Sequence, residues 1–344
     1  MLTGGYTDPS VAKTAISVIR YRGGDVVAVL DASRAGRTAG EVLGVGNDIP
    51  VVASLAEAPT ATELLVGIAP PGGELPADWR NTLAEAIVRG LDIVSGLHQF
   101  LGDDPELAAA AAARGTRLID VRRNQEREVA HRRGLRQACL RLHTVGTDCA
   151  VGKMVASIEI VRSLVRRGVD AKFVATGQTG IMIEGDGCPI DCVVSDFVNG
   201  AAERLVLANQ HHDVIAIEGQ GSIFHPRYSS VTYGLLHGSL PDCLVLCHEI
   251  GRREVWGLEG IPLPSLARAV EAFEAAANLM HPCRVVGVAL NGRTASDAEL
   301  EAERRRVRDE LGLPACDVFR HGADELAEAV LAHGRSIGKE PPSA

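Results

Sequence analysis

The segment from Gly146 to Lys153 has the residue types and spacing of a loop that binds phosphate. It reads GTDCAVGK, follows a predicted strand and precedes a predicted helix, which is the setting such a loop requires. Glycines let the backbone wrap around an anion, the helix N-terminus adds positive potential, and Lys153 supplies a point charge. The spacing is one residue longer than the usual Walker A motif, and Met154 stands where a Mg²⁺-binding hydroxyl is expected. A glycine-rich turn with a solvated lysine is the alternative interpretation.

Two residues further along the chain are candidates for acid–base chemistry. Glu218 ends the apolar run VIAIE, so its carboxylate should lie at the edge of a sheet, where it can hold Mg²⁺ or accept a proton from an amine. The alternative is a structural carboxylate that accepts backbone N–H groups. His225 lies in the loop that follows, and a histidine titrates near pH 6.5, which suits a general base. The alternative for His225 is a surface side chain.

Polar residues beside these candidates could contact a substrate. Gln178 and Thr179 lie in a glycine-rich stretch directly after a predicted strand, and such loops line the ligand crevice of α/β sheets. Gln220 and Ser222 follow Glu218, and backbone N–H groups in this stretch could stabilise a tetrahedral oxyanion. An ordinary flexible connection is the alternative for the first stretch.

Arg252 and Arg253 follow another apolar run and could clamp a substrate carboxylate, although a charged surface turn is an equal alternative. No metal site is predicted from the cysteines. Cys243 and Cys247 lie on a predicted strand, where positions i and i+4 are too far apart to share one ion.

The elements that must position these residues alternate between strands and helices. In the first third, apolar runs predict a parallel sheet of Rossmann-like type. The strands are expected at 26–30, 63–68, 92–95 and 117–121, with helices at 79–89 and 106–114. The sequence has no GxGxxG motif here, so a nicotinamide cofactor is not expected.

A charged stretch at 122–136 has no apolar period and is the predicted linker, which divides the chain into domains 1–135 and 136–344. The second domain is predicted as a P-loop NTPase-like parallel sheet. Its strands are expected at 138–145, 171–175, 214–218, 243–248 and 284–291, its helices at 153–167, 196–209, 266–280 and 296–311, with a glycine-rich loop at 176–187. Glu203 is expected about two turns into a helix, where it could be solvated, and the tail at 338–344 is expected to fray.

Composition narrows the class of protein. A chain of 344 residues exceeds what one core usually supports, so two domains are expected. The net charge of −9 argues against a broad nucleic-acid surface. No apolar run is long enough for a membrane span, no signal peptide is evident, and the eight scattered cysteines suggest reduced thiols. We therefore expect a cytoplasmic protein with a small-molecule substrate, and a homodimer because two-fold assemblies are common.

Two resemblances follow from these motifs. GTD at 146–148 with VGK at 151–153 resembles the loop of dethiobiotin-synthetase-like P-loop enzymes. EGQGS at 218–222 is similar to the second acidic motif of that group. Asn291 falls where such enzymes often place an asparagine that recognises a base. The resemblance implies a nucleotide- or cofactor-binding set, namely Gly146, Thr147, Asp148, Cys149, Ala150, Val151, Gly152, Lys153, Met154 and Asn291.

A closer resemblance covers nearly the whole chain. The strings GLHQFL (96–101), ATGQTG (175–180), DFVNGAAE (196–203) and IEGQGSIFHP (217–226) resemble the family of DgcN-type D-glutamate N-acetyltransferases. This resemblance implies a Rossmann-like domain followed by a P-loop domain. It also implies transfer of an acetyl group from acetyl-CoA to the amine of D-glutamate.

The expected roles follow from combining the residues with the resemblance. The catalytic set is Glu218, His225 and Lys153, with the phosphates of acetyl-CoA on the glycine loop. An ATP-dependent ligase or kinase acting on a small carboxylate is the second hypothesis, and it requires Mg²⁺ near Glu218 and Asp148. A nucleotide-sensing regulatory protein is the third.

Overall fold

The computed structural model describes residues 1–339 and contains two compact units. The N-terminal unit comprises Met1–Arg123 together with Ile181–Gly185, and the C-terminal unit comprises the rest of the described chain. The predicted boundary at 135 lies within an irregular segment that follows Arg123. No helix in the described part of the chain is long and apolar enough to cross a membrane.

The N-terminal unit is built on short parallel strands. Leu2 forms parallel bridges to both Leu30 and Val66, so it joins two small sheets that are otherwise separate. All strand pairs are parallel, as the Rossmann-like prediction requires. The strands are β1 (Val29–Leu30), β2 (Val51–Val52), β3 (Glu63–Leu65), β4 (Asp92–Ser95) and β5 (Leu118–Asp120).

Helices pack on these strands through apolar side chains. Trp79 is only 3% exposed and packs with Leu83 and Ile87 in the core of the unit. The Asp104 side chain accepts the N–H groups of the first turn of α4, which is the usual way to begin a helix. The helices are α1 (Lys13–Arg22), α2 (Ala39–Leu43), α3 (Arg80–Val88) and α4 (Pro105–Arg114).

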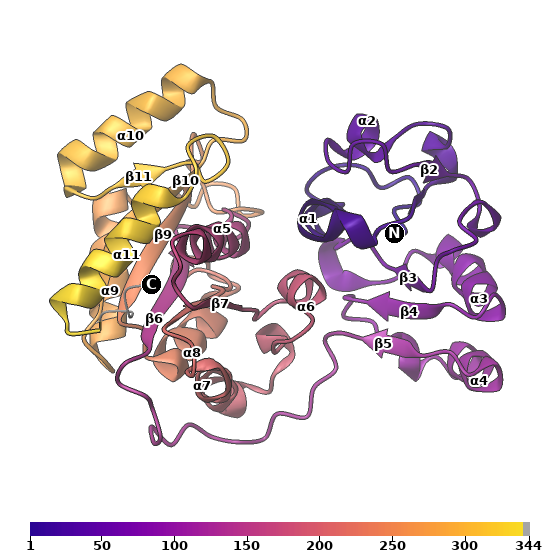
Figure 1. The fold of residues 1–344 in the computed structure, drawn as a ribbon, viewed down its shortest axis with the longest axis horizontal. Helices are drawn as coiled ribbons and strands as arrows, with labels where there is room; N and C mark the ends of the chain where they lie inside the picture. The colour runs from indigo at the N-terminus through magenta and orange to yellow at the C-terminus, as the bar shows by residue number, and fades with distance from the viewer. Residues whose placement is uncertain (340–344) are drawn as a thin grey trace. The chain divides into compact units, whose positions relative to one another are not determined.

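The C-terminal unit contains a six-stranded sheet in the order β11-β10-β9-β6-β8-β7, and every pair in it is parallel (Figure 1). The strand β6 lies between β8 and β9, so the loops after these three strands leave the sheet side by side at its carboxyl edge. The strands are β6 (Leu140–Gly146), β7 (Ala171–Val174), β8 (Val214–Ile217), β9 (Cys243–Glu249), β10 (Arg284–Asn291) and β11 (Ala315–Cys316).

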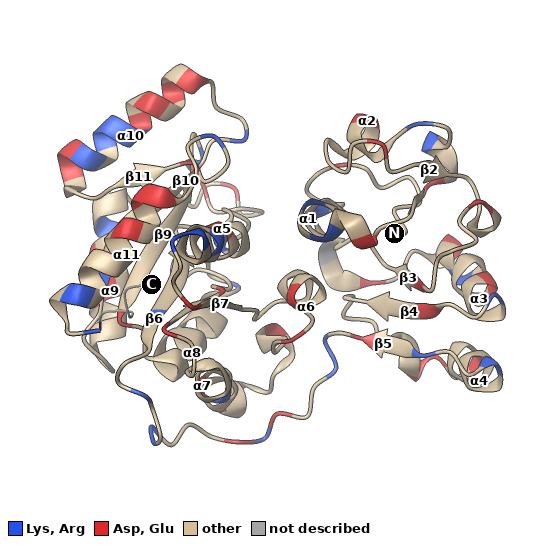
Figure 2. Cartoon of the chain, viewed as in Figure 1, with Lys and Arg blue, Asp and Glu red and all other residues tan. Residues whose placement is uncertain are grey.

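Helices cover both faces of this sheet. On one face, α5 (Lys153–Arg166) packs beside α11 (Asp324–Ser336). On the other face lie α7 (Val198–Asn209), α8 (Ser229–Ser239) and α9 (Leu266–Asn278), with α10 (Asp297–Leu311) next to α9. Figure 2 shows Arg, Asp and Glu along α10, whereas the neighbouring strands are largely without charge. This architecture confirms the predicted α/β fold class.

The irregular segment after Arg123 is anchored to α7. Glu203 is buried, and its carboxylate accepts the backbone N–H groups of His131, at 2.6 Å, and Arg132. A Cβ atom on Gly200 would collide with the carbonyl oxygen of Glu128, so α7 needs a glycine where the segment crosses it. The solvated position considered for Glu203 is therefore not the one it takes, and helical spacing gives no sign of an irregular segment lying across that face.

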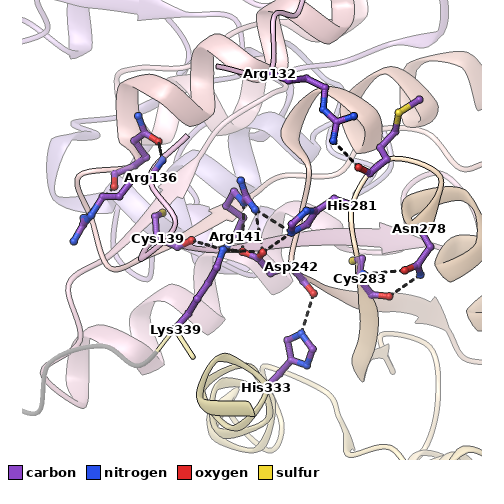
Figure 3. Close-up of polar contacts among 12 residues, drawn as sticks. Arg132, Arg136, Cys139, Arg141, Asp242, Asn278, His281, Cys283, His333 and Lys339 are labelled. Carbon is purple, nitrogen blue, oxygen red and sulfur yellow. Dashed lines mark hydrogen bonds and ion pairs between the residues drawn. The ribbon is translucent and has the colours of Figure 1, made fainter. Parts of the chain in front are cut away.

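A buried ion cluster closes the amino edge of the sheet (Figure 3). Its centre is the carboxylate of Asp242, which accepts hydrogen bonds from Arg141, from His281 at 2.8 Å and from Lys339 at 2.8 Å. Lys339 was expected to lie in a frayed tail, yet its ammonium is buried against Asp242 and the carbonyl of Cys139. The prediction is wrong at this residue, and the remainder of that tail, 340–344, lies outside the described residues.

Several other elements differ from prediction. The stretch 176–187, expected as a loop, contains the helix α6 (Gln178–Glu184), because Ile181, Met182 and Ile183 give it an apolar run that its glycines obscure. The helix α8 was not predicted, since its sequence is rich in serine and glycine. In the fold those glycines let α8 approach α7 closely, because a Cβ on Gly234 or Gly238 would meet α7 directly.

The cysteines agree with the prediction of mostly buried thiols. None of the eight forms a disulfide in the described chain, and six of them are buried. Cys149 and Cys192 are the two that retain partial exposure.

Candidate functional site

The phosphate loop connects the end of β6 to the start of α5. Its backbone turns through positive φ angles at Ala150 (56°) and Gly152 (105°). A Cβ atom on Gly146 would stand 2.7 Å from Val151 and 3.2 Å from the Lys153 Nζ, so the loop closes this tightly only around glycine. The backbone N–H groups of Ala150, Val151, Gly152 and Lys153 have no acceptor among the described residues. The loop therefore presents a row of donors that an anion can accept.

Lys153 lies at the centre of this loop. Its side chain is only 7% exposed, and its Nζ donates to the carbonyl oxygen of Asp148 at 2.8 Å. Within the described part of the chain it forms no ion pair, and burial lowers the pKa of Lys153 below its ordinary value. A buried ammonium that has only a carbonyl partner is a favourable partner for an anionic ligand.

The segment after Glu218 is fixed against the phosphate loop. Thr144 accepts the backbone N–H of Gly219 at 3.1 Å and contacts the Ser157 hydroxyl at 2.9 Å. A Cβ on Gly219 would collide with the Thr144 carbonyl oxygen. The two loops after β6 and β8 thus form one surface.

Glu218 follows β8 and is 4% exposed. Its Oε2 accepts the backbone N–H groups of Thr176 at 2.9 Å and Gly177 at 3.0 Å. Burial raises the pKa of Glu218 to about 7, even though these two amides favour the charged form. A carboxylate with a pKa near neutrality suits proton transfer at physiological pH.

Three consecutive amides follow this carboxylate. The backbone N–H groups of Gln220, Gly221 and Ser222 have no acceptor among the described residues. Gly221 has φ of 63°, and a Cβ there would collide with the carbonyl oxygen of Tyr228. The Ser222 hydroxyl is buried and accepts the N–H of Phe224 at 3.3 Å, so this side chain holds the turn. The free amides form a second anion-binding turn beside Glu218.

His225 is 1% exposed, and both of its ring nitrogens are engaged. The Nδ1 atom accepts the backbone N–H of Arg227 at 3.2 Å, and Nε2 donates to the carbonyl oxygen of Trp256 at 3.2 Å. These partners fix a neutral tautomer that has no free lone pair. The geometry therefore favours Glu218 over His225 as the base, and it gives His225 a positioning role.

Arg252 supports the phosphate loop. Its guanidinium donates to the Asp148 carboxylate at 3.0 Å, to the Cys149 carbonyl at 2.7 Å and to Glu249. These contacts leave little of Arg252 for a substrate carboxylate. Arg253 is exposed, and its side chain has no partner in the described part of the chain.

The remaining predicted residues line or support the two loops. Asn291 ends β10, and its Nδ2 lies 3.5 Å from the Val151 carbonyl oxygen. Thr147 is buried, with its hydroxyl 3.1 Å from His248. The Gln220 amide donates to the Thr176 hydroxyl at 3.3 Å. Gln178 and Thr179 begin α6, and Met154 lies in the first turn of α5.

One cluster has the composition of a metal site. Asp148, Cys149 and His225 each offer a ligand atom, and these atoms lie within 4.8 Å of one another. However, both nitrogens of His225 are engaged, and Arg252 already neutralises Asp148. The backbone N–H of Trp256 also donates to the Asp148 carboxylate, at 2.7 Å. This donor set does not suit a cation.

Comparison with known proteins gives two adjacent family matches. Residues 127–327 match a model described as a domain of unknown function (DUF1611_C), a P-loop domain. Residues 32–124 match its companion (DUF1611_N), a Rossmann-like domain.

Curated relatives and a solved structure agree with these matches. A D-glutamate N-acetyltransferase from Tritonibacter scottomollicae is 41% identical over 80% of this chain and 83% of its own length. One from a Pseudoalteromonas species is 40% identical over 77% of this chain and 80% of its own. The crystal structure of a DUF1611 family protein from Anabaena variabilis superposes with a TM-score of 0.90 at 37% identity, covering 96% of this chain and 98% of that one.

Proposed function

This chain belongs to the DUF1611 family, and on that premise we propose that it is an N-acetyltransferase that transfers an acetyl group from acetyl-CoA to the amine of D-glutamate. The observation that carries the proposal is the similarity to two relatives that bear the name D-glutamate N-acetyltransferase, at 41% and 40% identity. The loops after β6 and β8 supply the groups that such a transfer needs.

Proton removal is the first requirement. At neutral pH the α-amine of an amino acid is mostly an ammonium, which has no lone pair for attack. Glu218, buried and with a pKa raised to about 7, can take that proton in its carboxylate form. The freed amine then attacks the acetyl carbonyl carbon, and the C–S bond breaks as the amide forms. The nitrogen loses a second proton in this step, the departing thiolate of CoA takes up one proton, and the proton held by Glu218 passes to solvent.

Stabilisation of the tetrahedral intermediate is the second requirement. The free amides of Gln220, Gly221 and Ser222 follow Glu218 directly, and such donors are effective when they are already oriented before the reaction. The tight contacts of Gly219 and Gly221 with neighbouring backbone hold them in place. This turn is our candidate for the oxyanion site.

Binding of the donor is the third requirement. CoA carries phosphates, and we assign them to the free amides of the phosphate loop and to Lys153. Because the pantetheine arm separates these phosphates from the thioester, the proposal requires the arm to fold back toward Glu218. The substitution of Met154 for the Mg²⁺-binding hydroxyl is compatible with phosphates that need no metal.

The test is a coupled measurement with the purified protein, D-glutamate and acetyl-CoA. We expect release of free thiol and formation of N-acetyl-D-glutamate in equal amounts, and full activity in EDTA. Thiol release without D-glutamate dependence would contradict the proposal. Turnover of ATP that requires D-glutamate and Mg²⁺ would instead favour a ligase or kinase.

A further inference from the structure

Two exposed side chains, one aromatic and one basic, lie next to the proposed site, and neither has a hydrogen-bond or ion-pair partner in the described chain. Trp256 is 47% exposed, although it is one of only two tryptophans in the chain. Arg227 is exposed, and its guanidinium has no partner among the described residues. We refer to these two residues as the rim pair.

The backbone of Trp256 is held between two residues of the site. Its N–H donates to the Asp148 carboxylate at 2.7 Å, and its carbonyl accepts from His225 at 3.2 Å. The loop after β9 is thereby fixed beside the phosphate loop. Hydrogen bonds at both its N–H and its carbonyl thus fix the backbone that carries the exposed Trp256 indole.

The backbone of Arg227 is fixed from the same centre. Its N–H donates to the other nitrogen of His225, at 3.2 Å, and the turn continues into Tyr228, whose carbonyl packs against Gly221. The Arg227 guanidinium lies beside the loop that contains Trp256. Its Nη1 is 3.7 Å from the place where a Cβ on the next residue, Gly257, would stand. His225 thus joins the two members of the rim pair through its two ring nitrogens.

The acidic side chains near the phosphate loop pair with other arginines and leave Arg227 without an acidic partner in the described chain. Arg252 is committed to Asp148 and Glu249. Arg227 instead lies in a turn next to the free amides of Gln220–Ser222 and faces no acidic partner in the described chain. A guanidinium without a partner, next to the loop that carries an exposed aromatic side chain, is suited to bind a planar carboxylate.

We propose that Arg227 binds the side-chain carboxylate of the amino-acid acceptor, and that Trp256 forms the wall against which the acceptor lies. This inference rests on the proposed acetyl transfer and assigns it an acceptor subsite. It explains how the enzyme selects an acceptor with a second carboxylate, since an amide in that place could not form a charge-assisted bidentate pair.

The test compares D-glutamate with D-glutamine, which has nearly the same shape but no side-chain charge. For Arg227→Gln, we expect kcat/KM for D-glutamate to fall about 10- to 100-fold, the range for a lost hydrogen bond to a charged group. The value for D-glutamine should change less than about 3-fold. Arg305→Gln, which removes an exposed and equally unpaired arginine on α10, is the matched control and should leave both values unchanged. An equal fall for both acceptors would reduce Arg227 to a structural role and overturn the assignment.

Binding measured without turnover separates this inference from the proposed function. Titration of D-glutamate should change the fluorescence of Trp256, whereas Trp79 is buried in the N-terminal unit. Trp256→Phe should abolish the fluorescence change. Arg227→Gln should lower the affinity for D-glutamate, measured by this change, by the same factor as it lowers kcat/KM. If D-glutamate binds in this manner but no acetyl transfer occurs, the subsite stands and the proposed function fails. If transfer proceeds but Arg227→Gln leaves acceptor selectivity intact, the function stands and the subsite fails.

Discussion

The Nζ atom of Lys153 lies 2.8 Å from the carbonyl oxygen of Asp148, five residues earlier in the same loop. The Lys153 ammonium is therefore held within the loop by a neutral carbonyl oxygen, and the backbone N–H groups of Ala150 to Gly152 have no acceptor in the described chain. An incoming anion can replace this single contact with a charge-assisted one, which is the stronger interaction.

Lys153→Ala is expected to lower kcat/KM for acetyl-CoA by about 10- to 100-fold, because a hydrogen bond to a charged phosphate is lost. S-acetyl-pantetheine lacks the nucleotide phosphates, so the variant should use it about as well as the wild type does. Steady-state rates with both donors check this, and Lys172→Ala on β7 serves as control. A loss of equal size with both donors would show that Lys153 acts on the acetyl group instead of the phosphates.

Glu218→Gln is expected to lower kcat by about 10²- to 10⁴-fold, the usual contribution of a positioned general base. In the wild type the base must be ionised, so the rate should rise with pH and level off above the pKa of Glu218, which burial raises to about 7. The pH profile of kcat/KM measures this limb. A wild-type profile that is flat between pH 6 and 8 would argue against Glu218 as the base.

The Glu218 carboxyl group should make the folded protein less stable as the pH rises, whereas activity should increase over the same range. Its pKa is higher in the folded protein, about 7, than its ordinary value of 4.5, so the folded state binds the proton more tightly. The stability associated with Glu218 is therefore fully present below about pH 4.5 and is lost as pH rises to about 7. The free energy of unfolding of Glu218→Gln, relative to the wild type, should increase across this window and then level off. Denaturant unfolding of both proteins at several pH values tests the sign.

Asp242→Asn is expected to destabilise the C-terminal unit by about 3–5 kcal/mol, because it leaves Arg141 and Lys339 as buried cations without their partner. Burial by itself would raise the pKa of Asp242, but hydrogen bonds from His281, Arg141 and Lys339 hold it below its ordinary range. Asp170→Asn removes an exposed pair with His212 and should cost less than about 1 kcal/mol. Chemical denaturation of the three proteins gives the comparison, and similar losses for both variants would contradict the buried cluster.

The sequence determined the parts of the site that depend on local spacing. Glycine and lysine at fixed positions between a strand and a helix predicted the loop from Gly146 to Lys153. The apolar run before Glu218 placed that carboxylate at the end of a buried strand. The α/β alternation predicted parallel sheets in both units, and parallel strands covered on both faces require long apolar runs such as β9.

Only the tertiary structure decided which side chains are free to act. Arg252 and Arg227 are both arginines in loops, and sequence offered no reason to prefer Arg227. In the fold, Arg252 is committed to Asp148, whereas Arg227 has no partner in the described chain. His225 likewise resembles a general base until both of its ring nitrogens are found engaged with backbone. The physical reason is that these contacts join loops that follow different strands, β6, β8 and β9, and only the order of those strands in the sheet brings the loops together.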